Sequence, residues 1–93
     1  MVEIGDEVEI EMGDDVLIIG WVTDTHIDDH EETVTVTEAH AFHRIWGGSN
    51  GRRGHQTRAS AHRVKPVRSG YRHIVKEVKE RYENRKPEHR QVD

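Results

Sequence analysis

The chain has 93 residues and a net charge of −4, and charged residues (34%) slightly outnumber apolar ones (32%). This length allows one small domain with a modest core and excludes large enzyme scaffolds. The absence of cysteine excludes disulfides, thiolate nucleophiles and cysteine-bound zinc. No apolar run approaches the ~20 residues that cross a bilayer, and the N-terminus does not resemble a signal peptide. We therefore expect a protein of the cytoplasm or of a virion that no signal peptide secretes.

Charge is distributed unevenly along the chain. Residues 1–38 contain thirteen acidic side chains and no Lys or Arg, whereas residues 39–73 contain eight basic side chains and no acid. Such asymmetry bears on partners and association rather than on fold. The acid-rich, lysine-poor composition is also typical of proteins from halophilic organisms, in which surface acids need no specific partner.

The first half of the chain predicts strands. Residues 6–12 alternate in character, as a half-buried strand does. One face carries Val8, Ile10 and Met12, and the other carries Glu7, Glu9 and Glu11. Residues 13–15 have the composition of a turn. Residues 16–23 are apolar at both odd and even positions, which predicts a central strand covered on both faces. Gly20 within this strand indicates a bulge or bend.

The middle of the chain predicts further strands separated by two loops. Residues 28–32 form an acidic, polar segment that we interpret as a hairpin loop. Residues 33–37 alternate threonine and valine, and strand character resumes over residues 41–46. The glycine/arginine-rich residues 47–54 predict a mobile loop. A weaker strand is expected within residues 55–64, followed by an edge strand at residues 64–67, where Pro66 cannot donate to a ladder.

The C-terminal part predicts one helix. Ser69 is a candidate cap for a helix from about Tyr71 to Arg85, which Pro87 ends. An apolar stripe at helical spacing should dock on the sheet, and it comprises Tyr71, Ile74, Val75, Val78 and Tyr82. Glu77 and Arg81 are spaced for a favourable i,i+4 pair. The predicted organisation is a β-barrel domain over residues 1–70, an amphipathic helix packed on it over residues 71–86, and a tail over residues 87–93.

These elements predict a mainly β protein of four or five strands with one C-terminal α-helix. The opening segment, residues 5–10, the glycine of the second strand and the closing segment, residues 63–67, resemble a small SH3-like β-barrel. The expected fold is therefore an SH3-like barrel or half-barrel with a helix appended.

One segment also carries a family resemblance. Residues 16–46 contain a hydrophobic strand, a turn, an alternating strand and a closing Arg-Ile-Trp, here Arg44-Ile45-Trp46 after Ala39-His40-Ala41-Phe42-His43. In this pattern they resemble short uncharacterised proteins encoded by tailed phages. The resemblance covers about a third of the chain and implies a viral origin, and it brings no known activity or site residue.

Catalytic and metal motifs are weak. Residues 47–51 match Gly-x-Ser-x-Gly, but that motif works on a strained strand-to-helix turn with distant partners, and here a glycine-rich basic segment follows. Paired aspartates such as Asp14-Asp15 lie in turns, where they serve the backbone. The eight histidines are scattered, and His40 and His43 should point to opposite faces of a strand. We therefore expect no enzyme, no cofactor and no metal site.

The basic stretch, residues 44–72, supports a nucleic-acid hypothesis. Cationic side chains neutralise phosphates, and an aromatic side chain can stack on bases. The candidate basic face comprises Arg44, Trp46, Arg52, Arg53, Arg58, Arg63 and Arg68. Net acidity opposes this hypothesis, because uncompensated acids repel a polyanion.

Association through both charge types uses the asymmetry more fully. The candidate acidic face comprises Glu7, Glu9, Glu11, Asp28, Asp29, Glu31 and Glu32. An acidic face on one subunit that meets a basic face on another is a heterologous contact, which builds rings or larger assemblies. The leading hypothesis is a non-enzymatic structural or interaction subunit of a homo- or hetero-oligomeric protein assembly, such as a virion or virus-encoded accessory component; the alternative is a nucleic-acid-binding small barrel.

Overall fold

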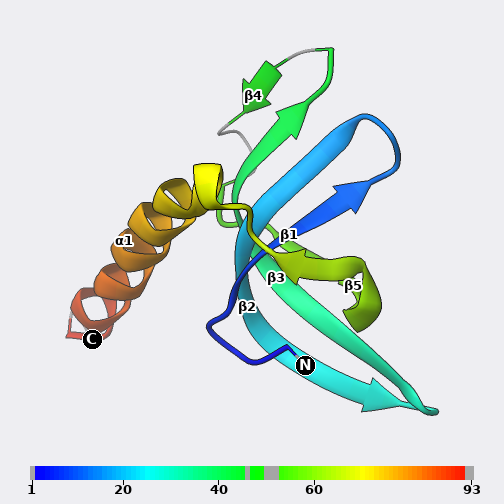
Figure 1. Cartoon of the computed structure of the whole chain (residues 1–93). Coiled ribbons are helices and arrows are strands. Elements are labelled where there is room, and N and C mark those ends of the chain that lie inside the picture. Colours follow the sequence, from blue (N-terminus) through cyan, green and yellow to red (C-terminus); the bar gives the residue numbers. More distant parts are fainter. Residues whose placement is uncertain (1, 46, 50–52, 92–93) are drawn as a thin grey trace.

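The computed structural model of the chain describes residues 2–45, 47–49 and 53–91. Six strands, two short 3₁₀ turns and one helix follow one another along the chain (Figure 1). The strands are β1 (Glu7–Met12), β2 (Val16–Asp28), β3 (Glu31–His43), β4 (Gly47–Ser49), β5 (Gln56–Ser60) and β6 (Val64–Pro66). The 3₁₀ turns are η1 (Ala61–Arg63) and η2 (Ser69–Tyr71), and the helix is α1 (Arg72–Gln91).

All strands belong to one antiparallel sheet in the order β4-β3-β2-β1-β6, and β5 also pairs with β3. β4 pairs with residues 41–43 of β3 and β5 with residues 33–37, so both lie along one edge of that strand. The sheet is therefore a curled half-barrel five strands wide. The turn η1 leads the chain from β5, at the β3 edge, to β6, at the β1 edge. The mainly β class, the half-barrel and the C-terminal helix are confirmed.

The sheet is buried on both faces, as the continuous apolar run of β2 predicts. One face supplies a core cluster inside the half-barrel, which comprises Val8, Ile10, Val22, Val34, Val36, Ala59 and Val64. The other face packs against α1 in a second cluster, which comprises Ile19, Trp21, Ala39, Val67, Val75 and Val78. The predicted helix stripe is confirmed, because Tyr71, Ile74 and Tyr82 pack against this second cluster. Burial on two faces gives a chain of this size a second source of hydrophobic stabilisation.

Gly20 marks a bulge, as the sequence predicts. The register between β2 and β3 shifts between Ile19 and Gly20. A Cβ at Gly20 would lie 2.0 Å from the backbone oxygen of Thr37 and 3.1 Å from the Cα of Glu38. Only glycine allows the two backbones to approach this closely.

The hairpin between β2 and β3 differs from the sequence prediction. The predicted loop at residues 28–32 shrinks to a two-residue turn, because Asp28 pairs with Glu31 and Ile27 with Glu32. Asp29 and His30 have φ angles of 46° and 72°, the left-handed pair that a tight two-residue hairpin turn requires. Strand pairing thus continues through residues whose composition is that of a loop.

Both ends of the helix also differ. Ser69 does not cap it, because Ser69–Tyr71 forms the 3₁₀ turn η2 and α1 begins at Arg72. The helix continues through Pro87 to Gln91, so the predicted end before the proline is wrong. The expected pair of Glu77 and Arg81 forms with an N–O distance of 2.9 Å. No described helix has the length and apolar character needed to span a bilayer.

Candidate interaction surfaces

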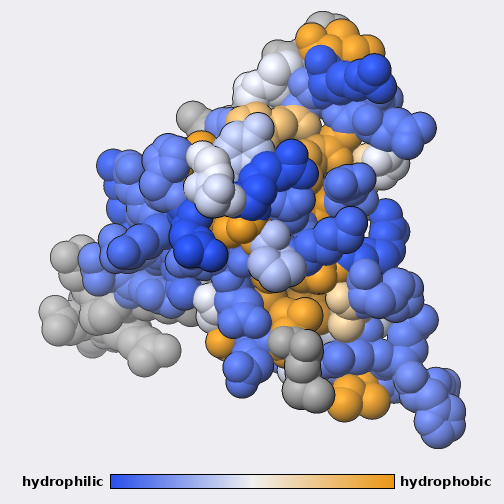
Figure 2. All heavy atoms as spheres, in the orientation of Figure 1, coloured by the Kyte–Doolittle hydropathy of each residue, from blue (hydrophilic) through white to orange (hydrophobic). Residues whose placement is uncertain are grey.

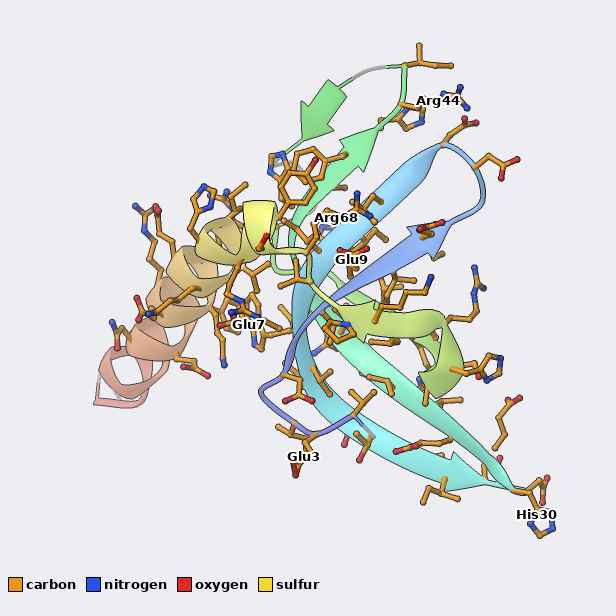
Figure 3. All side chains as sticks on the ribbon, viewed as in Figure 1. Glu3, Glu7, Glu9, His30, Arg44 and Arg68 are labelled. Atoms are coloured by element: carbon orange, nitrogen blue, oxygen red, sulfur yellow. The ribbon has the colours of Figure 1, made fainter. Side chains whose placement is uncertain are left out.

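The β2–β3 hairpin projects from the rest of the molecule. Pairing between β1 and β2 ends at Trp21, and the N-terminal segment continues it only to Val22. On the other side, pairing between β3 and β5 begins at Thr33. Residues 24–32 therefore pair only within the hairpin, and we name them the arm. Figure 1 shows the arm extending away from α1, and Figure 3 places His30 at its tip.

The arm carries the whole charge imbalance of the chain. It contains five acidic residues and no Lys or Arg, namely Asp24, Asp28, Asp29, Glu31 and Glu32. Since the net charge of the chain is −4, the remaining residues together carry +1. The arm also exposes one large apolar side chain, because Ile27 is 74% exposed. Hydrophilic side chains cover the end of the arm at the lower right of Figure 2.

Glu9 is not part of an acidic surface, and the structure corrects this expectation. Its residue exposure is only 6%. Its carboxylate accepts hydrogen bonds from Nε and Nη2 of Arg68, at 3.0 and 2.8 Å, and a third from the Arg68 backbone N–H at 2.8 Å. The side-chain hydrogen bond with Arg68 lowers the pKa of Glu9, although burial acts in the opposite direction. Figure 3 shows these two side chains meeting where β1 passes the segment after β6.

Basic side chains from β6 and the turn before it also lie beside the acidic residues of β1. Lys65 lies opposite Glu9 in the β1–β6 register. Nη2 of Arg63 donates to the backbone oxygen of Glu11 at 3.0 Å. Glu11 is exposed and Glu7 is half-buried. The predicted separation of an acidic β1 face from a basic face that contains Arg63 and Arg68 is therefore wrong, because β6 returns beside β1 and brings the basic residues with it.

Arg44 and Arg58, two further members of the predicted basic face, lie far apart on the sheet. Arg44 follows the end of β3, opposite the arm (Figure 3), whereas Arg58 lies on β5 beside Thr35. The last residue of β3, which precedes Arg44, and Thr35, which pairs with Arg58, are eight residues apart on that strand. This separation corresponds to about 26 Å along an extended strand. Arg53 is exposed, and its Nε donates to the backbone oxygen of Ala39 at 3.2 Å. The other two members, Trp46 and Arg52, lie outside the described residues.

Arg58 lines a polar groove on the helix-bearing face of the sheet. The groove has a volume of about 470 Å³ and is lined by Thr23, Asp24, Thr35, Thr37, Gln56, Arg58 and Tyr82. The hydroxyl of Thr37 donates to that of Thr23 at 3.2 Å. The groove therefore offers hydroxyl and amide groups, one cation and one carboxylate, a mixture that suits a polar ligand.

A larger groove lies where the N-terminal segment, β6 and the start of α1 meet. Its volume is about 670 Å³, and its lining comprises Val2, Gly5, Asp6, Glu7, Val8, Val64, Lys65, Pro66, Arg72 and Lys76. Arg72 and Lys76 are one helical turn apart, so that they project from the same side of α1. Sequence reasoning missed this groove as a site. The i,i+4 spacing of these two basic residues is the only signal of it in the sequence.

The metal-ligating side chains and part of the Gly-x-Ser-x-Gly match can be placed on the described residues. No three His, Asp or Glu side chains in this part of the chain are placed to hold one metal ion. Of the Gly-x-Ser-x-Gly match, Gly47 and Gly48 lie in β4, and residues 50 and 51 fall outside the described ranges.

Comparison of the chain with protein-family models, with curated proteins and with solved structures finds no match.

Proposed function

We propose that this protein is a non-enzymatic interaction subunit of a larger assembly and that the arm is its contact element. The observation that carries the proposal is the arm itself, a projecting hairpin on which the charge excess of the chain is concentrated. The resemblance of residues 16–46 to tailed-phage proteins extends the proposal to a virion or a virus-encoded accessory component.

Ordering the arm costs more conformational free energy than its packing recovers. Ordering a residue costs about 1–2 kcal/mol of backbone entropy, and residues 24–32 contribute no side chain to either core cluster. A two-stranded hairpin is only marginally stable without packing. A projecting hairpin of this kind therefore suits a role outside the fold, as an element that a partner orders.

The charges of the arm also restrict its partners. Two free strand edges are templates for pairing with another strand, and charged side chains prevent that pairing between identical edges. Five acids on one short arm repel a second arm and every polyanion. A cationic protein surface is favoured, and contact with Ile27 adds apolar burial.

Light scattering of the purified protein, alone and mixed with the products of neighbouring genes, tests this proposal. We expect a complex whose mass falls as salt screens the charges. A variant with Asp28→Asn, Asp29→Asn, Glu31→Gln and Glu32→Gln should lose the complex and keep its circular dichroism spectrum. A monomer at every concentration and ionic strength, with every such partner, contradicts the proposal.

A second candidate function is nucleic-acid binding through the Arg58 groove. It is favoured by an exposed arginine beside hydroxyl groups and the aromatic ring of Tyr82, and opposed by Asp24 in the same lining. Fluorescence anisotropy with single- and double-stranded DNA and RNA separates the two functions. Binding that falls steeply with salt and is lost in Arg58→Ala supports this function, whereas no binding at ~50 mM salt contradicts it.

A further inference from the structure

We propose that the groove between the N-terminal segment, β6 and α1 receives the arm of a second copy of this chain. This inference rests on the proposed function, because it names the partner of the arm. The groove is called the docking groove below.

The docking groove combines an apolar floor with a cationic wall. Val8 and Val64 are 3% and 7% exposed and belong to the core inside the half-barrel. Lys65 on β6 and Arg72 and Lys76 on α1 supply three exposed cations. Within the described residues, none of these three side chains forms an ion pair. The charges of Arg72 and Lys76 are therefore available to an incoming anion, whereas Lys65 also attracts the Glu9 carboxylate opposite it.

The opposite wall of the docking groove is acidic. It carries Asp6, which precedes β1, and Glu7, the first residue of β1. Asp6 is already engaged, because its Oδ2 accepts a hydrogen bond from the backbone N–H of Glu3 at 2.9 Å. A bound acidic segment would therefore lie against β6 and α1 rather than against β1.

The arm complements this groove in two respects. Its acids match the cations of β6 and α1, and its one large exposed apolar side chain, Ile27, matches the accessible apolar lining of the groove, Val2 and Pro66. Contact there removes apolar surface of Ile27 from water, which favours binding. Opposed charges then add orientation and association rate more than affinity.

A chain cannot satisfy this contact with its own arm. Figure 3 shows His30, at the arm's tip, well away from Glu7, which lines the docking groove. Figure 1 shows the arm and α1 extending from the sheet in different directions. A contact between two different surfaces is heterologous, so it produces a closed ring or an open chain of subunits.

Charge reversal with sedimentation equilibrium tests this inference on the full chain. The arm variant is Glu31→Lys with Glu32→Lys, and the groove variant is Lys65→Glu with Lys76→Glu. The control variant, Asp14→Lys with Asp15→Lys, makes the same charge change as the arm variant in the exposed turn between β1 and β2. Circular dichroism at each salt concentration separates association from unfolding.

We expect the wild-type protein to associate with rising concentration and to dissociate with added salt. The arm and groove variants should each associate at least about tenfold more weakly, because like charges then face one another. An equimolar mixture of these two variants should regain association, since the reversed arm fits the reversed groove. The control variant should behave as the wild type does.

Three results overturn the inference. They are a wild-type protein that stays monomeric, a mixture that fails to regain association, and a control variant that weakens association as much as the arm variant does. A monomeric wild type whose arm still binds a different protein overturns only this inference, and the proposed function stands. A monomeric wild type that binds nothing through its arm removes both.

Discussion

Arg68 grips the carboxylate of Glu9 through both its guanidinium group and its backbone N–H, with donor–acceptor distances of 2.8–3.0 Å. The two residues are 59 positions apart in the sequence, so this contact ties the first strand to the segment that leads into α1. The guanidinium group also lies over the Tyr71 ring, 5.7 Å from its centroid, and Tyr71 stacks on Phe42. One cation thus links β1, β3 and the turn η2 that precedes the helix.

The two halves of this ion pair should respond differently to removal. The Arg68 side chain is 52% exposed and the Glu9 side chain 7%. Arg68→Ala therefore leaves a buried carboxylate without its partner, whereas Glu9→Gln leaves a cation that water solvates. We expect Arg68→Ala to lower the free energy of unfolding more than Glu9→Gln does. Urea unfolding measures both values. Equal costs would contradict the burial of Glu9.

The same pair makes stability depend on pH. Because the hydrogen bond with Arg68 lowers the pKa of Glu9 in the folded protein below its ordinary value of 4.5, the ionised carboxylate stabilises the fold above that value. The contribution is lost as the pH falls through the lowered pKa of the folded state. We expect Arg68→Ala to move the acid-unfolding midpoint, measured by circular dichroism, to higher pH. Arg81→Ala, which removes the exposed pair with Glu77, serves as the control and should leave the midpoint in place.

Gly20 should not tolerate a side chain. A methyl group there would overlap the backbone oxygen of Thr37, and neither strand can move without breaking the ladder between β2 and β3. We expect Gly20→Ala to cost about 2–3 kcal/mol in thermal or urea unfolding. At Gly70 a Cβ would meet no atom within 4 Å, so Gly70→Ala is the matched control and should be nearly neutral. A neutral Gly20→Ala would show that the bulge is absent.

The helix should depend on its apolar stripe. Val75 is fully buried between α1 and the sheet, and Val75→Ala removes packing at the centre of that contact. We expect a loss of about 2 kcal/mol in unfolding free energy, together with a weaker edge contact between Trp21 and Tyr82 that Trp fluorescence detects. Glu80→Ala, on the exposed side of the same helix, should change neither signal.

The fold could be predicted where local pattern and burial agree. The alternation that places Val8 and Ile10 in the core, the two-sided run of β2, the bulge at Gly20 and the stripe of α1 are each set by neighbours in the sequence. The burial of Glu9 could not be predicted, because it depends on Arg68. That residue comes beside β1 only when β6 pairs with the edge of the sheet. Alternation alone places Glu9 on a polar face, and nothing local marks it as buried.

The arm could not be predicted for a different reason. Residues 28–32 have the composition of a loop, and only cross-strand pairs such as His26 with Thr33 make the flanking residues strands. Its charge was visible in the sequence, but its projection follows from where β1 and β5 stop pairing. The docking groove depends in turn on how α1 sits against β6, which no local pattern specifies.

The arm is the proposed contact element of the protein, and backbone hydrogen exchange measures its engagement most directly. Exchange is compared between the assembled protein at low salt and the dissociated protein at high salt, with circular dichroism confirming the fold in both. We predict that amides of residues 24–32 become more protected on assembly while those of core residues Val34 and Val36 do not change. Unchanged exchange in the arm, with new protection elsewhere, would contradict the account.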